Sequence, residues 1–219
     1  MERNHHRLRR GGEKSSYAKI KLDEAELEEA SNTAVSSVLF REGEACGSCY
    51  ELLCDAKSDP AWCIDGTRRL RVTATNLCPQ SGWCDASRHH FDLSQPAFRW
   101  IASYKAGIVP VFYRKVPCLR KGGVRFSMIG HAYYNTVVLS NVGGSGQVRS
   151  VWMKADGLGG WQQLNRNWGA CWQNSTPNLE GRTLSFIVTL RNGKTRTFYN
   201  VIPANWRFGQ SFFSNTQFY

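Results

Sequence analysis

The chain lacks any long hydrophobic run. Over its 219 residues, no apolar stretch reaches the roughly 18 residues that a membrane-spanning helix needs, which excludes an integral membrane protein. The first thirty residues also lack the apolar block of a secretory signal, and they pass instead from basic to acidic. We therefore expect no membrane span, and we expect residues 1–31 to form an atypical charged tail.

Acidic residues are scarce as well. Seventeen Asp and Glu stand against 28 Lys and Arg, which leaves a formal net charge of +11. A surface this basic suits polyanions such as nucleic acid, anionic lipid or acidic polysaccharide. With 42% hydrophobic and 21% charged residues, the composition excludes a disordered chain or a fibrous repeat. It provides enough apolar material for one large domain or two small ones.

Cysteine, tryptophan and glycine are plentiful. The chain has eight, eight and twenty of them, a composition typical of a β-rich extracellular protein with disulfides. Cys46 and Cys49 have the CxxC spacing of a redox pair or of half a zinc site, but no second CxxC follows and no βαβ pattern surrounds them. Structural disulfides are therefore favoured over a metal site, and spacing alone leaves their pairing open. No metal and no cofactor is predicted.

Short predicted strands separated by turns begin at Cys46. Apolar residues at helical spacing between Pro96 and Gly107 predict one helix over residues 96–106. The basic, glycine-containing segment 120–123 (RKGG) is the best candidate for a domain boundary, and seven of the eight cysteines precede it. The strands expected before this boundary cover residues 50–53, 70–74 and 108–113.

Strands recur at regular intervals beyond the boundary. Their spacing, without helices between them, is typical of a β-sandwich. Asn192-Gly193 lies between two β-rich runs and predicts a two-residue hairpin. The expected strands cover residues 124–129, 134–140, 148–154, 184–190 and 195–201. The pattern predicts two all-β domains, the first with one helix.

One carboxylate has a distinctive setting. Asp92 lies between Phe91 and Leu93, and an acid flanked by apolar residues suits a proton donor. The alternative, which the local sequence favours, is that Asp92 caps the following helix or closes an Asx turn. Inverting hydrolysis of a glycoside would need a second carboxylate about 6.5–9.5 Å away. Nothing in the sequence selects one among the candidates Asp55, Asp59, Asp65 and Asp85.

The second half of the chain is rich in aromatic residues. On a flat β-face such rings stack on sugar rings, and the same residues can equally fill a sandwich core. Tyr134 opens an expected strand and Trp168 follows a polar run, so we expect these two to be exposed. The aromatic set comprises Tyr133, Tyr134, Trp152, Trp161, Trp168, Trp172 and Trp206.

Taken together, these motifs resemble the expansins, and the alpha-expansins most closely. The resemblance covers residues 32–219 and keeps the order and spacing of its motifs across both domains. The segments that carry it are CGSCYELLC (46–54), RVTATNLCP (71–79), GWC (82–84), HFDLSQPAF (90–98), AGIVPVFYRKVPC (106–118), KGGVRF (121–126), SVWMKADGLGGWQQLNRNWGACW (150–172) and VIPANWRFGQSF (201–212). The family's usual opening segment is replaced by the charged tail, and the loop between Cys78 and Cys84 is short.

The resemblance implies a fold and a function. Residues 32–118 would form a double-psi β-barrel with a short helix, incomplete at its start. Residues 119–122 would be a linker, and residues 123–219 an immunoglobulin-like β-sandwich that binds carbohydrate. The implied function is loosening of plant cell walls by disrupting non-covalent contacts between cellulose and matrix glycans, without hydrolysis and hence without enzymatic activity. The alternatives, in order, are a carbohydrate-binding protein that does not loosen walls because its barrel is incomplete, a residual endoglucanase and a nucleic-acid-binding protein.

The resemblance also implies site residues and partners. Asp92 matches the family's HFD aspartate, and Thr75 and Asn76 match polar positions that line its groove. Tyr134 and Trp168 match the aromatic surface of the binding domain, with Trp161 a further candidate. The expected partners are cellulose, xyloglucan or other matrix glycans and acidic pectin, with no nucleic acid, for a monomer secreted to the cell wall. The implied disulfides are Cys49–Cys118, Cys54–Cys63 and Cys78–Cys84, which leave Cys46 and Cys171 outside the pattern.

Overall fold

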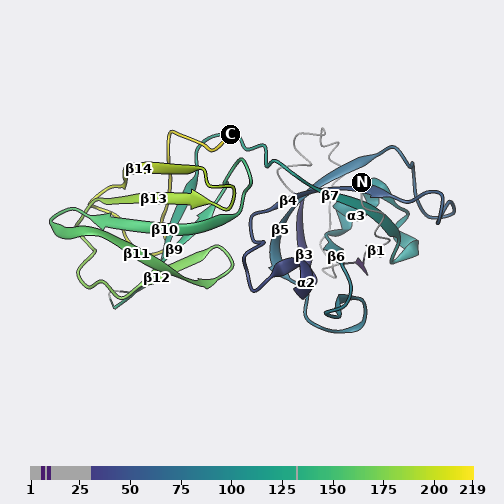
Figure 1. The fold of residues 1–219 in the computed structure, drawn as a ribbon, viewed down its shortest axis with the longest axis horizontal. Coiled ribbons are helices and arrows are strands. Elements are labelled where there is room, and N and C mark those ends of the chain that lie inside the picture. Colours follow the sequence, from purple (N-terminus) through teal and green to yellow (C-terminus); the bar gives the residue numbers. More distant parts are fainter. Residues whose placement is uncertain (1–5, 8, 11–30, 132) are drawn as a thin grey trace. The chain divides into compact units, whose positions relative to one another are not determined.

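The computed structural model describes residues 6–7, 9–10, 31–131 and 133–219 of the chain. It divides into two compact units, Met1–Val116 and Pro117–Tyr219 (Figure 1). Both units consist mainly of strands, and the described helices, all short, lie in the first unit, where the sequence predicted one helix. Most of the expected tail over residues 1–31 lies outside the described residues. None of the described helices is long and apolar enough to cross a membrane.

The first unit is a mixed seven-stranded sheet that nearly closes into a barrel (Figure 1). The strand order is β1-β7-β4-β5-β3-β6-β2. Two neighbouring pairs, β3 with β5 and β2 with β6, run parallel, and the other pairs run antiparallel. The strands are β1 (His6–Arg7), β2 (Arg9–Arg10), β3 (Asn32–Val35), β4 (Cys49–Cys54), β5 (Arg69–Leu77), β6 (Phe91–Leu93) and β7 (Pro110–Val116).

Alternation along these strands builds the core of the first unit. Every second side chain of β5 points inward, from Leu70 through Val72 to Ala74, and all three are buried. Phe91 and Leu93 enter the same core from β6, on either side of the outward-facing position between them. The short helices of this unit are α2 (Ser37–Phe40), α3 (Gln95–Ile101), η1 (Gly82–Cys84) and η2 (Tyr104–Ala106).

The helix predicted over residues 96–106 is shorter than expected. It ends at Ile101 because Ala102 has extended backbone angles and forms a β-bridge with Cys63. Backbone hydrogen bonds from Ile64 to Ile101 and from Ser103 to Trp62 hold this bridge at 3.0 and 2.8 Å. A non-local contact therefore overrides the helical spacing of the local sequence.

Disulfides hold the loops of the first unit. They join Cys54 to Cys63 and Cys78 to Cys84, with Cα atoms 5.7 and 5.9 Å apart. These are two of the pairs that the resemblance implies. Cys49 and Cys118 are also disulfide-bonded, whereas Cys46 and Cys171 are thiols. Because Cys49 is in a disulfide, the CxxC segment is not a dithiol redox pair. The sequence analysis had favoured structural disulfides, and this agrees with it.

The second unit is a sandwich made from one folded sheet. The strand order is β14-β13-β10-β11-β12-β9-β8-β15. The first half of β11 pairs with β10 and its last residues pair with β12, so this strand carries the sheet from one layer to the other. The strands are β8 (Arg125–His131), β9 (Tyr134–Ser140), β10 (Val148–Ala155), β11 (Leu158–Trp168), β12 (Cys171–Asn174), β13 (Leu184–Leu190), β14 (Thr195–Ile202) and β15 (Ser211–Phe213).

Ring contacts between the layers confirm the sandwich. Phe126 on β8 stacks on Phe186 on β13 with ring centroids 4.9 Å apart, and it meets Phe198 on β14 edge-on at 5.1 Å. These strands are far apart in the sheet order, so only face-to-face layers bring the rings together. The fully buried Trp206 belongs to the same core.

Two features of the second unit differ from expectation. The predicted hairpin at Asn192-Gly193 exists, but four residues (191–194) rather than two connect β13 and β14. Gly193 has a φ of +85°, and it is the residue of this connection with positive φ. The sequence also missed β11, β12 and the short β15. In β11, Gly159-Gly160 and the polar Gln162 and Arg166, which pair with the buried Met153 and Trp172, break the apolar alternation.

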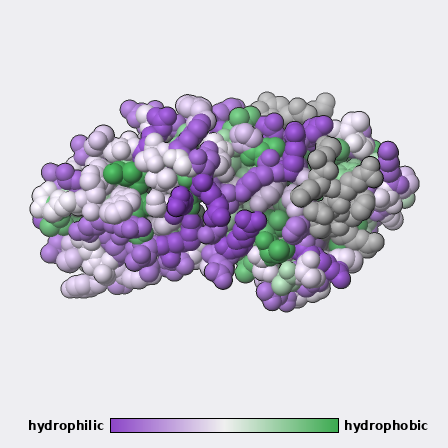
Figure 2. Space-filling view, viewed as in Figure 1, coloured by the Kyte–Doolittle hydropathy of each residue, from purple (hydrophilic) through white to green (hydrophobic). Residues whose placement is uncertain are grey.

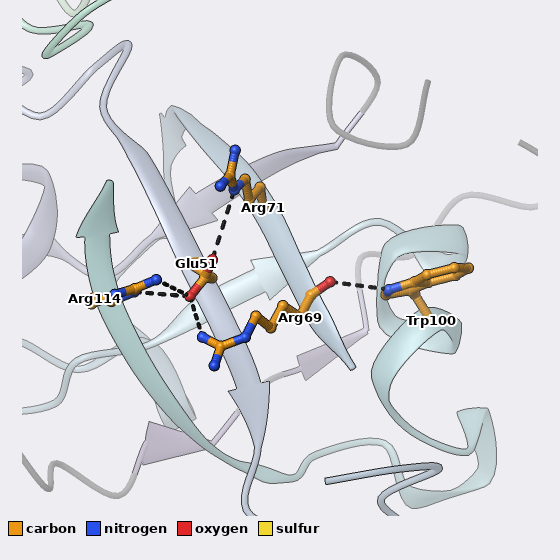
Figure 3. A network of polar contacts seen from close by, with 5 residues as sticks. All are labelled: Glu51, Arg69, Arg71, Trp100 and Arg114. Atoms are coloured by element: carbon orange, nitrogen blue, oxygen red, sulfur yellow. Dashed lines mark hydrogen bonds and ion pairs between the residues drawn. The ribbon is translucent and has the colours of Figure 1, made fainter. Parts of the chain in front are cut away.

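A buried carboxylate lies in the middle of the barrel sheet (Figure 3). The side chain of Glu51, on β4, is 6% exposed. Its Oε1 accepts hydrogen bonds from Arg69 Nη1 at 2.6 Å and from Arg114 Nε at 2.8 Å, and its Oε2 lies 3.7 Å from Arg71 Nε. Burial by itself raises the pKa of Glu51, but the hydrogen bonds from the arginines outweigh it and hold that pKa below its ordinary value of 4.5. The network therefore links β4 to both of its neighbours.

The phenylalanine stack predicts a large stability difference. Phe126→Ala should lower the free energy of unfolding of the second unit by about 3–5 kcal/mol, because a large ring leaves a cavity between the layers. Phe213→Ala is the matched control, since that ring is 62% exposed, and it should cost no more than about 0.5 kcal/mol. Denaturant unfolding followed by tryptophan fluorescence measures both. Equal losses for the two variants would contradict the sandwich packing.

The Glu51 network predicts pH-dependent stability. A carboxylate whose folded pKa is lowered stabilises the fold above its unfolded pKa, and the contribution is lost as pH falls through the folded value. Glu51→Gln should therefore cost about 1–3 kcal/mol near pH 7, and the gap to the unmodified protein should narrow well below pH 4.5. The exposed Glu42→Gln should change little at either pH. Denaturant titrations of all three proteins at both pH values measure these free energies of unfolding. A difference between Glu51→Gln and the unmodified protein that does not change with pH would refute the role of the charge.

Candidate functional site

Three strands of the first unit place two predicted site residues on one row. Ala34 on β3 pairs with Asn76 on β5 and with Asp92 on β6. Side chains at directly paired positions point to the same face of a sheet. The neighbouring rows, through Thr33 and Val35, are buried, whereas Asn76 is exposed. Asn76 and Asp92 therefore share an outward row about 10 Å wide, with only a methyl group between them.

Thr75 lies beside this row. The register of β3 against β5 shifts between Thr33 and Ala34, and Thr75 is the residue of β5 that the shift skips. Its side chain is exposed, and its carbonyl oxygen lies 3.8 Å from the Cys46 sulfur. The structure thus brings Thr75, Asn76 and Asp92 to one region of the first unit.

Asp92 belongs to a strand rather than to a helix cap. Ser94 occupies the N-cap of α3, two residues later. The Asp92 carbonyl oxygen accepts a hydrogen bond from the Thr33 hydroxyl at 3.0 Å, and its carboxylate Oδ2 lies 3.9 Å from the sulfur of the disulfide-bonded Cys78. The Asp92 carboxylate is half-buried in the outward row, with its Oδ1 buried, and the row continues to Arg9 on β2.

The other candidate carboxylates mostly serve their own turns. Asp55 is buried and accepts hydrogen bonds from the Ser58 hydroxyl and amide. Asp65 accepts from Thr67, and Asp85 accepts from Ser87 at 2.8 Å through the amide. Hydrogen bonding to these turns lowers the pKa of both Asp65 and Asp85. Local turn formation therefore explains three of the four carboxylates without any catalytic role.

The side chain of Tyr134 reaches along the outer face of the second unit. Tyr134 begins β9, yet its hydroxyl donates to Gln173 Oε1 on β12 and accepts from Asn167 Nδ2 on β11 at 2.9 Å. Since β9, β12 and β11 are consecutive neighbours in the sheet, side chains of the next two strands hold the hydroxyl. The ring is 40% exposed, and the His131 ring lies 6.2 Å away on β8.

Trp168 lies on the same side of the sheet. It pairs with Cys171 on β12, which pairs with Val138 on β9, and Trp168 is 47% exposed. Trp161 is half-buried and lies in the other half of β11, the half that pairs with β10. The structure therefore groups Tyr134 with Trp168 and leaves Trp161 apart.

Sequence reasoning missed the residues that hold Tyr134. Asn167 and Gln173 have no chemical motif around them, and the only signal was the polar run before Trp168. Nearby, burial raises the pKa of the Cys171 thiol, so this sulfur is a poor nucleophile at neutral pH. In the described part of the chain, no group of three or more His, Cys, Asp or Glu residues is arranged to hold a metal ion.

Two family models match the two units. The model described as the expansin C-terminal domain matches residues 124–203. The model DPBB_1, described as lytic transglycolase, matches residues 32–113. Together they cover more than half of the chain, in the order that the sequence predicted.

Solved structures share the fold. The crystal structure of an apo expansin from Clavibacter michiganensis matches with a TM-score of 0.72 at 20% identity, over 99% of this chain and 98% of that chain. A mutant of the same expansin, in complex with cellohexaose, matches with a TM-score of 0.72 at 19% identity and the same coverage. The predicted fold class, a double-psi β-barrel followed by an immunoglobulin-like β-sandwich, is confirmed.

Curated plant proteins are more similar in sequence. Expansin-A12 of Arabidopsis thaliana is 53% identical over 189 residues, which span 84% of this chain and 74% of the relative. Expansin-A25 of Oryza sativa subsp. japonica is 50% identical over 193 residues, with the same two shares. Relatives this similar, over most of both chains, establish what the motifs indicated: the chain belongs to the expansin family.

Proposed function

We propose that this protein loosens plant cell walls by disrupting non-covalent contacts between cellulose and matrix glycans, without hydrolysing either. The exposed ring of Tyr134, held in place by hydrogen bonds at its hydroxyl, is the observation that carries the proposal. It offers one apolar face to a sugar ring at little cost in side-chain entropy, since Gln173 and Asn167 already hold it in place. The solved relative that contains cellohexaose supports a glucan as the ligand.

Tyr134 and Trp168 would bind the glucan chain by stacking. Their positions differ by about four residues along the strands and by two strands across the sheet, about 13 Å and 10 Å. Two separated platforms suit an extended chain better than a single compact sugar. Polar side chains between them, from Asn167 and Gln173, would face the hydroxyl groups of the chain.

Asp92 would act on the polysaccharide at the first unit. Asp92 and Asn76 share one row of the sheet, and the small Ala34 lies between them. The carboxylate of Asp92 and the amide of Asn76 would hydrogen-bond sugar hydroxyls. Inverting hydrolysis needs a second carboxylate to activate water. Since Asp55, Asp65 and Asp85 are engaged in their own turns, the proposal assigns Asp92 a binding role rather than that of a catalytic acid.

The expected partners follow from this role. We propose cellulose as the main ligand, with xyloglucan or another matrix glycan displaced from it and acidic pectin attracted by the charge of +11. The protein would act as a monomer in the cell wall. A glycan-binding protein without loosening activity is the second candidate, and cellulose binding without wall extension would favour it.

Removing the stacking rings tests the binding surface. Tyr134→Ala and Trp168→Ala should each weaken cellulose binding by about 1–2 kcal/mol, roughly 5- to 30-fold, because each loses a stacking platform. Tyr134→Phe should weaken it less, since the ring remains and only its hydroxyl anchors are lost. Tyr199→Ala is the control, a tyrosine 75% exposed on β14. A cellulose pull-down measures all four, and a loss for Tyr199→Ala as large as for Tyr134→Ala would count against the assigned face.

Replacing the carboxylate tests the loosening step. Asp92→Asn should abolish or strongly reduce the extension of isolated walls and weaken cellulose pull-down less than Tyr134→Ala does, because the stacking rings would provide most of the affinity for cellulose. Asp59→Asn, at the candidate carboxylate outside the site, should leave extension intact. Full extension by Asp92→Asn would remove the role given to that residue. Steady release of reducing sugar from cellulose by the unmodified protein would overturn the non-hydrolytic mechanism.

A further inference from the structure

The arginines around Glu51 form a basic face that the proposed function does not use. Glu51 lies between Arg71 on β5 and Arg114 on β7, and Leu53, two residues along β4, lies between Arg69 and Phe112. Paired positions share a face, so the three guanidinium groups emerge on one side of the barrel sheet, as Figure 3 shows. We call Arg69, Arg71 and Arg114 the arginine face.

Two exposed guanidinium groups lie over one buried carboxylate at this face. Among the described residues, Glu51 is the carboxylate that contacts the three arginines. The Arg69 and Arg114 side chains are 53% and 57% exposed, although the carboxylate beneath them is 6% exposed. The charge of Glu51 is therefore buried, and the Arg69 and Arg114 guanidinium groups face solvent.

Hydrogen-bonding capacity is also left over. A guanidinium group has five N–H donors. Arg69 gives one of them to Glu51, and Arg114 gives two, from Nε and Nη2. The remaining donors of these two side chains are held in a defined orientation, because the bonds to Glu51 restrain the planes of both groups. Restrained guanidinium groups are well suited to a planar carboxylate, which they bind through two parallel hydrogen bonds.

We propose that the arginine face binds the carboxylates of an acidic polysaccharide, of the uronate type. Arg69 on β5 and Arg114 on β7 lie on either side of β4, at two strand spacings, about 10 Å, which suits a polymer with repeated charges better than a single small anion. Single-stranded nucleic acid would call for exposed aromatic platforms among the basic groups. The aromatic residues near these arginines, Phe112 and Trp100, are both half-buried. The proposal rests on the proposed function, which places the protein among wall polysaccharides.

The net charge of +11 makes diffuse attraction the rival explanation, and Figure 2 shows hydrophilic residues over much of the visible surface of both units. A matched pair of variants separates the two. Arg69→Gln/Arg114→Gln removes two charges from the arginine face, and Arg149→Gln/Lys154→Gln removes two exposed charges from β10. Both variants have a formal net charge of +9, from +11 less two. If the attraction is diffuse, both variants should bind the acidic polysaccharide equally weakly. If the arginine face is a binding site, only Arg69→Gln/Arg114→Gln should bind it more weakly.

The test is a titration of each full-length variant with polygalacturonate at low ionic strength. Binding by Arg69→Gln/Arg114→Gln should weaken at least tenfold, and binding by the β10 variant less than about twofold. Arg69→Lys/Arg114→Lys should also weaken it, since lysine keeps the charge and loses the planar fork. Equal weakening by both Gln pairs, no binding by the unmodified protein, or tighter binding of a DNA oligonucleotide than of polygalacturonate would overturn the proposal.

Two controls keep the result interpretable. If Arg69→Gln/Arg114→Gln unfolds because Glu51 loses its partners, the triple variant with Glu51→Gln removes the stranded charge, and its net charge of +10 is matched by Arg149→Gln alone. Cellulose pull-down should be unchanged in all arginine variants, and polygalacturonate binding should be unchanged in Tyr134→Ala. An unexpected result in the polygalacturonate titration alone would therefore contradict the arginine face, and one in the cellulose pull-down alone would contradict the stacking surface.

Discussion

A slip of β6 by one residue against β3 would turn Asp92 into the core and Phe91 towards solvent, because side chains alternate across a strand. Burial of Phe91 and Leu93 opposes that slip, and each fully buried side chain contributes about 1.5–3 kcal/mol. The apolar core thus holds the register, and the register places the polar row outward. In this unit the packing of the inner face determines what the outer face can bind.

The same constraint acts in the second unit through Trp172. Its ring is buried and is covered by the Arg166 guanidinium at 4.3 Å, which keeps the inward positions of β11 and β12 together. Gln173 then has to point outward, and with it the oxygen that receives the Tyr134 hydroxyl. The hydrogen bond that holds the exposed Tyr134 hydroxyl therefore depends on a tryptophan on the opposite side of the sheet. The core thus positions the surface to which we assign sugar stacking.

The limits of sequence prediction follow from how local each signal is. Apolar alternation gave the bounds of β9 and β13 as observed, because both strands pack one face on the core. The exposure of Tyr134 and Trp168 was also predicted, from the polar context of each residue. The row through Ala34 was not predictable from spacing, since it depends on the pairing of β3 with two strands distant in sequence. Spacing alone failed where a non-local pairing placed the residue, and there the resemblance to the expansins indicated the residues instead.

The two proposed surfaces differ in the physics of binding. Stacking on Tyr134 and Trp168 buries apolar ring faces and should respond weakly to salt. Contacts at the arginine face are charge-assisted and partly exposed, so counterions screen them within a Debye length of about 8 Å at physiological ionic strength. Each surface belongs to a different unit, so that one chain combines a salt-resistant contact for a neutral glucan with a salt-sensitive contact for an acidic one. Such a division would let ionic conditions in the wall change one contact without changing the other.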